Sequence, residues 1–203
     1  MNFIAFTFGY TAVGKSTIAK RISQIPNTDI FHSAIIRKEM NLTPKTSEEA
    51  DRFFDYRNHL RDDIDKIVYK ILAEKAESSL KKGKNVVLDA GYFFNWQRQM
   101  IYDETEKFGA ELFIIKVLCD DEEEIKRRLV KRKQDFLLSP LNETPSWNTY
   151  LATKQITESL DKDNFPENLK INILKYDSIE KKLSPLIETL SQNSEQIKKY
   201  ILE

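Results

Sequence analysis

Short runs of apolar residues alternate along the chain with longer segments in which apolar residues recur at helical spacing. The short runs are bounded by glycine or polar residues, so they predict β-strands at residues 3–8, 29–32, 85–88, 112–119 and 171–176. The longer segments predict helices at residues 15–24, 47–82, 95–108, 121–133, 146–160 and 180–202. Strands that alternate with helices indicate an α/β fold in which helices cover both faces of a parallel sheet, giving three αβα layers.

For two segments the sequence allows more than one interpretation. Residues 47–82 form one helix or two, and their apolar face predicts core packing, with lining of a substrate pocket by the N-terminal end as the alternative. The stretch "KQDFLLSPLNETPSWN" at residues 133–148 contains two prolines and mixed polarity. We expect a single domain over residues 1–203 with a small lid at about residues 128–148.

The charge balance narrows the range of partners. Lys and Arg number 32 and Asp and Glu number 32, so the chain of 203 residues has no overall basic field for a nucleic-acid backbone. Its single cysteine, Cys119, cannot form an internal disulfide, which is typical of a reducing compartment. The sequence shows no signal peptide and no apolar run long enough to span a bilayer. We therefore expect a cytoplasmic protein without membrane or nucleic-acid partners.

The first predicted strand runs directly into "GYTAVGKS" at residues 9–16. This stretch matches G-x-x-x-x-G-K-[ST], in which a glycine-rich turn points successive backbone N–H groups at phosphates, next to the start of a helix. In this pattern the lysine reaches the β- and γ-phosphates and the hydroxyl residue binds Mg²⁺. The motif therefore predicts ATP and Mg²⁺ as ligands, with binding residues Gly9, Thr11, Ala12, Val13, Gly14, Lys15, Ser16 and Thr17.

A second polar strand end is found in "NVVLDAG" at residues 85–91, which places Asp89 at the same edge of a parallel sheet. An acid at this edge orients Mg²⁺ together with Ser16, or accepts a proton from a hydroxyl nucleophile. A solvated or helix-capping aspartate is the structural alternative.

Two arginines lie four residues apart in "EIKRRLVKR", beside the predicted lid. Arg128 and Arg132 share one helical face and could neutralise charge on a transferred phosphoryl group or bind the nucleotide. An ordinary helix with surface ion pairs is the alternative.

Taken together, these motifs resemble the P-loop kinase group that includes small ATP-dependent kinases, polynucleotide 5′-hydroxyl kinases, zeta-toxin-like kinases and chloramphenicol phosphotransferase. The resemblance covers most of the chain and rests on "GYTAVGKST", "HSAIIRKEM", "VVLDAGYFFNWQRQMI", "KRRLVKR" and "SPLNETPSWNTYL". It implies a five-stranded parallel sheet of order 2-3-1-4-5 and transfer of the γ-phosphoryl group of ATP to an acceptor hydroxyl.

One position departs from the pattern of these families. They carry an Asp, three residues before the arginine of the second-strand motif, that resembles a general base. Here Arg37 matches the arginine, but the acidic position is Ala34. Asp89 or His32 could replace the base, the transition state could be loose enough to need none, or the protein could bind ATP as a regulator with little or no transfer.

The sequence therefore predicts an ATP-dependent kinase that phosphorylates a hydroxyl of a small molecule, with Lys15, Arg37, Asp89, Arg128 and Arg132 in catalytic roles. A 5′-hydroxyl nucleic-acid kinase and an ATP-binding regulatory protein are the alternatives. The aromatic residues of "GYFFNW" at residues 91–96 either line the acceptor pocket or pack in the core. The identity of the acceptor and the oligomeric state stay open.

Overall fold

The computed structural model describes residues 2–43, 46, 49, 52–53, 60–134, 145–188 and 191–203. Its strands are β1 (Phe3–Phe8), β2 (Thr28–His32), β3 (Asn85–Asp89), β4 (Glu111–Leu118), β5 (Lys170–Asp177) and β6 (Lys182–Ile187). Its helices are α1 (Lys15–Ile22), α2 (Ser33–Glu39), α4 (Leu60–Lys81), α5 (Asn95–Lys107), α6 (Glu122–Gln134), α7 (Trp147–Ile156) and α8 (Gln192–Leu202), with a 3₁₀ turn at Leu160–Lys162.

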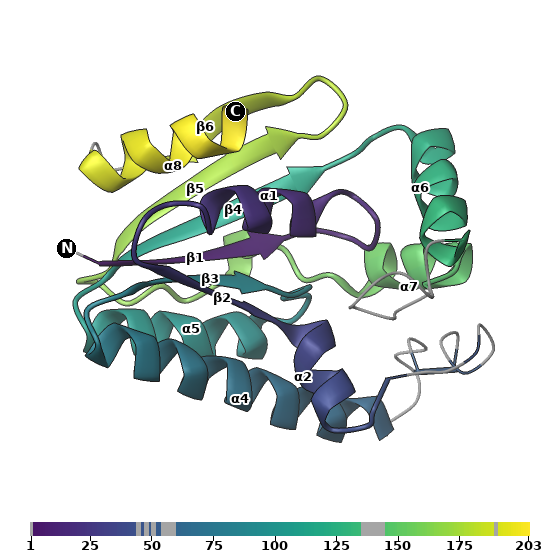
Figure 1. Cartoon of the computed structure of the whole chain (residues 1–203), viewed down its shortest axis with the longest axis horizontal. Coiled ribbons are helices and arrows are strands. Elements are labelled where there is room, and N and C mark those ends of the chain that lie inside the picture. Colours follow the sequence, from purple (N-terminus) through teal and green to yellow (C-terminus); the bar gives the residue numbers. More distant parts are fainter. Residues whose placement is uncertain are drawn as a thin grey trace.

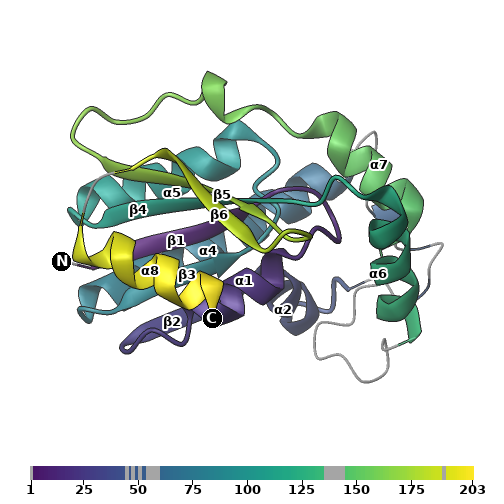
Figure 2. The same ribbon diagram turned by 90° about the horizontal axis from the view of Figure 1, so that it is seen from above.

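The described strands form one sheet of order β2-β3-β1-β4-β5-β6. The first five are parallel, so the predicted order 2-3-1-4-5 is confirmed. Helices α4 and α5 cover one face of the sheet, while α1 and α8 lie on the other, and α6 and α7 stand beyond one end of it (Figures 1 and 2). In the part of the chain that the structure describes, no helix is long and apolar enough to cross a membrane.

Alternating side chains of the central strands supply the two layers of the core. In β4, Leu112 and Ile114 belong to the apolar cluster under α4 and α5, whereas Phe113, Ile115 and Val117 belong to the cluster on the α1 and α8 side. This two-residue period explains why the strand sequences read as nearly continuous apolar runs, since both faces are buried.

The last predicted helix, over residues 180–202, is wrong in its first half. Residues Lys182–Ile187 form β6, which pairs antiparallel with β5 and makes six strands instead of the expected five. Pro185 explains the change, because proline cannot donate the hydrogen bond of a helix interior but is tolerated on the edge strand of a sheet. Among the described residues of this stretch, only α8, from Gln192 onward, is helical.

The other predicted helix boundaries differ less from those in the structure. The helix predicted over residues 146–160 ends at Ile156, where Thr157 is extended. Helix α2, directly after β2, was not predicted. Of the helix expected over residues 47–82, α4 accounts for 60–81, and most of 47–59 lies outside the described residues, as do residues 135–144 of the predicted lid.

A buried ion pair joins α5 to the segment that follows α7. The side chains of Arg98 and Asp163 are both fully buried, with Arg98 Nη2 donating to Asp163 Oδ1 at 2.5 Å and Nε donating to Oδ2 at 2.6 Å. Tyr102 and Asn95 donate to the same carboxylate at 2.6 and 2.8 Å. Burial raises the pKa of Asp163, but the hydrogen bonds from Arg98, Tyr102 and Asn95 outweigh it, so the pKa lies below its ordinary value.

We predict that Arg98→Met lowers the free energy of unfolding by about 3–5 kcal/mol, because it leaves a buried carboxylate without its cation. Since the pKa of Asp163 is lowered in the folded state, the stabilisation is present above the ordinary carboxyl pKa and is lost as pH falls through the lowered value. Denaturant unfolding at several pH values measures both effects. Lys107→Met removes ion pairs at the surface, one with Glu104 of the same helix and one with Glu77 of α4, and serves as control. An equally small loss in both variants would contradict the prediction.

Candidate active site

Three neighbouring strands end at one edge of the sheet, and two of them end in polar residues. His32 ends β2 and is aligned with Asp89 at the end of β3, and β1 ends next to them at Phe8. The chain then turns at Gly9, whose φ is 144° and where a Cβ atom would lie 2.4 Å from the carbonyl oxygen of Val117. Only glycine fits this approach, so the first glycine of the motif is required by the packing of the loop against β4.

The loop between Gly9 and α1 holds a backbone that suits anion binding. Ala12 and Gly14 have positive φ values of 65° and 110°, and Gly14 is the N-cap of α1. Such left-handed residues before a helix N-terminus let consecutive N–H groups converge on one point. The Lys15 ammonium group lies over this loop and donates to the carbonyl oxygen of Tyr10 at 2.6 Å.

Arg128 of α6 forms hydrogen bonds with carbonyl groups of the same loop. Its Nη1 donates to the carbonyl oxygens of Val13 at 2.9 Å and Ala12 at 3.3 Å, and to Ser178 Oγ at 3.0 Å. Its Nε donates to Glu124 at 2.8 Å, and Arg127 and Arg128 together lower the pKa of Glu124 to about 2. The guanidinium therefore stabilises two consecutive carbonyl groups of the loop.

Asp89 is the centre of a buried polar network. Oδ2 lies 2.9 Å from His32 Nδ1, and Oδ1 accepts a hydrogen bond from Thr7 at 3.3 Å. Burial raises the pKa of Asp89, but hydrogen bonds from His32 and Ser16 and the charge of Lys15 outweigh it, so its pKa lies below the ordinary value. The group is a carboxylate at neutral pH.

The contact between Ser16 and Asp89 tests whether the site suits Mg²⁺. A hydroxyl and an ionised carboxylate meet beside the phosphate-binding loop. Mg²⁺ prefers such oxygen ligands, usually one or two protein groups together with phosphates and water. The two side chains therefore fit the metal that the motif predicts.

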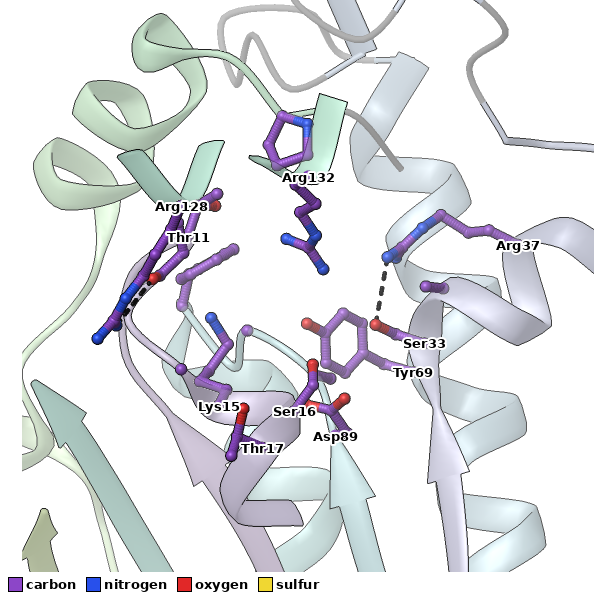
Figure 3. A pocket seen from close by; sticks show the side chains of 17 residues that line it. Thr11, Lys15, Ser16, Thr17, Ser33, Arg37, Tyr69, Asp89, Arg128 and Arg132 are labelled. Atoms are coloured by element: carbon purple, nitrogen blue, oxygen red, sulfur yellow. Dashed lines mark hydrogen bonds between the residues drawn. The ribbon is translucent and has the colours of Figure 1, made fainter. Parts of the chain in front are cut away.

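Helices α2 and α4 form the opposite wall. Arg37 is only 5% exposed, and its Nη2 donates to Ser33 Oγ at 3.2 Å. Tyr69 of α4 reaches the same space, and its hydroxyl accepts a hydrogen bond from the backbone N–H of Tyr92 at 3.2 Å. Figure 3 shows Arg37 entering from one side and Arg132 from above, across from Lys15 and Asp89.

These elements enclose a pocket with a volume of about 290 Å³. Most of the predicted site residues line it: Thr11, Ala12, Gly14, Lys15, Ser16, Thr17, Arg37, Asp89, Arg128 and Arg132. Gly9 and Val13 do not; Gly9 packs against β4, and Val13 is buried and presents its carbonyl oxygen to Arg128. Ala34, at the position of the absent general base, is part of the lining.

Ser33 and Tyr69 also line the pocket, although neither was predicted from the sequence. A hydroxyl residue directly after β2 was the available signal for Ser33. Nothing in the sequence distinguished Tyr69 from the apolar core face of its helix. Of the aromatic residues, Phe93 lines the pocket, while Trp96 is 36% exposed and stands outside the lining.

Gly91 determines where the Phe93 ring lies. A Cβ atom at Gly91 would meet carbon atoms of that ring at 2.4 Å, so the ring folds back over the glycine. In this position the ring centroid is 6.0 Å from Lys15 Nζ. The pocket thus has an apolar surface between its cationic walls.

The parallel order, the phosphate-binding loop and the pocket define the fold of P-loop kinases. The chain belongs to the AAA domain family, whose model (AAA_33) matches residues 4–141. No curated protein sequence matches it.

Solved structures share the fold at low sequence identity. A provisionally named kinase from Chloroflexus aurantiacus J-10-fl has a TM-score of 0.60 at 10% identity, covering 98% of this chain and 96% of that one. A sugar kinase from Janibacter sp. HTCC2649 has a TM-score of 0.58 at 14% identity, covering 98% and 92%. Kti12 from Chaetomium thermophilum, in complex with ADP-AlF3, has a TM-score of 0.57 at 11% identity, covering 97% and 96%.

We predict that Arg128→Met weakens ATP binding by about 10- to 100-fold, because the loop carbonyl oxygens lose a charged donor. Arg127→Met is the matched control, since Arg127 is exposed and pairs with the same Glu124 without contacting the loop. Calorimetric titration with ATP compares the two variants. Equal affinities would show that Arg128 does not support the loop.

Proposed function

We propose that the protein is an ATP-dependent phosphotransferase that moves the γ-phosphoryl group of ATP to an oxygen atom of a small molecule. The observation that supports this most directly is one pocket in which Lys15 and Ser16 of the phosphate-binding loop face Asp89 on one side and Arg37 and Arg132 on the other. Donor groups and a second cationic wall in the same space are what transfer between two substrates requires.

Each donor-side residue has a defined task in this proposal. The loop N–H groups between Ala12 and Ser16 hold the β- and γ-phosphates, and Lys15 exchanges the Tyr10 carbonyl oxygen for phosphate oxygens. Ser16 and Asp89 would hold Mg²⁺, which when bound neutralises phosphate charge.

The acceptor side consists of Arg37, Tyr69, Phe93 and the space above Ala34. Arg132 reaches the pocket from α6. In this proposal it stabilises charge on the transferred phosphoryl group. The pocket of about 290 Å³ suits a small acceptor. The sequence resemblance predicts a hydroxyl as the attacking group, and a hydroxyl acceptor stays a prediction.

Ala34 favours a second candidate function. Without a general base at this position the protein could bind ATP as a regulatory protein and transfer little or nothing. This candidate requires tight nucleotide binding with no phosphorylated product from any acceptor.

We predict that Lys15→Ala abolishes turnover and weakens ATP binding by about 100-fold, because a charged donor to the phosphates is lost. Lys20→Ala, which removes an exposed lysine from the same helix, serves as control. Transfer of label from γ-labelled ATP and equilibrium binding measure the two effects. Normal turnover in Lys15→Ala would contradict the proposed function.

We further predict that Asp89→Asn lowers turnover by about 100-fold or more but ATP affinity by less than about tenfold, because its charge matters most for the transition state. The same assays apply. Equal loss of turnover and affinity would exclude a catalytic role for Asp89.

A further inference from the structure

One turn of α7 contacts the first residues of the phosphate-binding loop. The Thr153 side chain is fully buried, and its Oγ1 accepts a hydrogen bond from the backbone N–H of Thr11 at 3.2 Å. One turn earlier, the ring of Tyr150 packs edge-on against the ring of Tyr10, with the centroids 6.3 Å apart. The helix stands beside the loop at this end of the sheet (Figures 1 and 2). Two consecutive loop residues are therefore held by one turn of the helix.

The direction of the Thr153 hydroxyl is determined by the helix itself. Its proton is donated to the carbonyl oxygen of Tyr150 at 2.9 Å, so a lone pair of Oγ1 is left for Thr11. The chain directly after the helix is fixed in turn, because the N–H of Glu158 donates to the carbonyl oxygen of Phe93 at 2.8 Å. The acceptor that Thr11 meets thus has a defined position and orientation.

The hydrogen bond from Thr11 fixes a whole peptide unit. A trans peptide is planar, and its C=O and N–H groups point in opposite directions. The N–H of this unit belongs to Thr11 and points to α7, whereas its C=O belongs to Tyr10 and accepts from Lys15 Nζ at 2.6 Å. The orientation of this one peptide therefore determines where the start of the loop presents a carbonyl oxygen and where it presents an N–H group.

The next residues of the loop show that its conformation needs support from outside. Ala12 has a φ of 65°, and a left-handed residue with a side chain persists only where surrounding contacts hold it. Arg128 of α6 binds the carbonyl oxygens of Ala12 and Val13. Thr153 of α7 supplies the contact at the residue before them. The loop is thus held by two helices, each at a different peptide.

We propose that Thr153 is a positioning residue for nucleotide binding, which holds the peptide between Tyr10 and Thr11 in the orientation that the phosphate-binding loop needs. The inference rests on the nucleotide binding that is part of the proposed function, and not on transfer. Thr153 acts through the loop backbone and is not among the described residues that line the pocket. Without its hydroxyl, other orientations of this peptide compete, and the apparent dissociation constant for ATP rises by the factor by which the binding-competent fraction falls.

Two matched pairs of side chains isolate the hydroxyl group. Wild-type Thr153 and Thr153→Val have nearly the same shape, and Thr153→Ser and Thr153→Ala differ only by the hydroxyl, so the second pair decides if Thr153→Val does not fold. We expect ATP to bind about tenfold more weakly to the member of each pair that lacks the hydroxyl, because an unpaired N–H group disfavours the native orientation of the peptide. Calorimetric titration with ATP and Mg²⁺ measures the affinities. Equal affinities within the pairs would overturn the inference.

Hydrogen exchange of the Thr11 amide, measured without nucleotide, reports on the contact itself. We expect this amide to exchange at least about tenfold faster in Thr153→Val and Thr153→Ala than in the wild-type protein and Thr153→Ser. The same exchange rate with and without the hydroxyl would show that Thr153 does not hold this peptide, and the inference would be wrong.

Thr149→Val separates positioning of the loop from a general loss of helix stability. Thr149 lies one turn earlier in α7, is 2% exposed, and its hydroxyl accepts from the N–H of Ser146 at the N-terminal cap. We expect this variant to unfold at a lower temperature but to bind ATP within about twofold of the wild-type affinity. An equal loss of ATP affinity in Thr149→Val and Thr153→Val would overturn the inference, since a weakened helix would explain both.

The failure of this inference is distinguishable from that of the proposed function. Normal ATP affinity in all variants would overturn the role of Thr153 and leave the proposed function intact. Absence of ATP binding by the wild-type protein would overturn the proposed function and this inference with it.

Discussion

The hydrogen bonds from Arg128 to the carbonyl oxygens of Ala12 and Val13 are the interaction on which the site depends. A loop that directs its N–H groups to one side must direct carbonyl groups to the other, and those carbonyl groups need donors. Ala12 also adopts a left-handed conformation that costs a residue with a side chain about 1–2 kcal/mol. A guanidinium that binds two consecutive carbonyl oxygens offsets this cost and links the loop to α6. The phosphate-binding loop is therefore held from outside by the helix that also carries Arg132.

The second constraint is the burial of a carboxylate at the end of β3. Asp89 is 7% exposed, and such a charge is stable only when donors surround it. The three donors come from different elements: Thr7 from β1, His32 from β2 and Ser16 from α1. The parallel register aligns His32 with Asp89, so the network follows from sheet topology. Its three donors hold the carboxylate of Asp89 in one position at the end of β3.

The sequence was informative wherever a local rule determines geometry. The glycines and Lys15 of the loop, the acid at the end of a strand and the order of the parallel strands all follow from short patterns, and the structure confirms the strand order. Prediction from the sequence failed where tertiary contacts determine the position of a side chain or the type of an element. Tyr69 lies on an apolar helix face, and only the packing of α4 against β3 places it at the pocket. The four-residue spacing predicts that Arg128 and Arg132 share one helical face. It does not predict that Arg128 binds the carbonyl oxygens of the loop. The strand around Pro185 was hidden by the helical period of its neighbours.

The stretch from Thr153, in the last turn of α7, to Asp163 explains how the two halves of the pocket keep their relative positions. At its start, Thr153 of α7 accepts a hydrogen bond from the backbone N–H of Thr11 in the phosphate-binding loop at 3.2 Å. Further along, the N–H of Glu158 donates to the carbonyl oxygen of Phe93 at 2.8 Å. At its end, Asp163 binds Arg98, whose Nη1 donates to the carbonyl oxygen of Tyr92 at 2.9 Å. One continuous stretch of the chain thus contacts both the loop between β1 and α1 and the wall that carries Phe93. If the protein is the phosphotransferase proposed above, its reaction depends on in-line placement of two substrates. A displacement of this stretch would then alter their alignment even where every lining residue is intact.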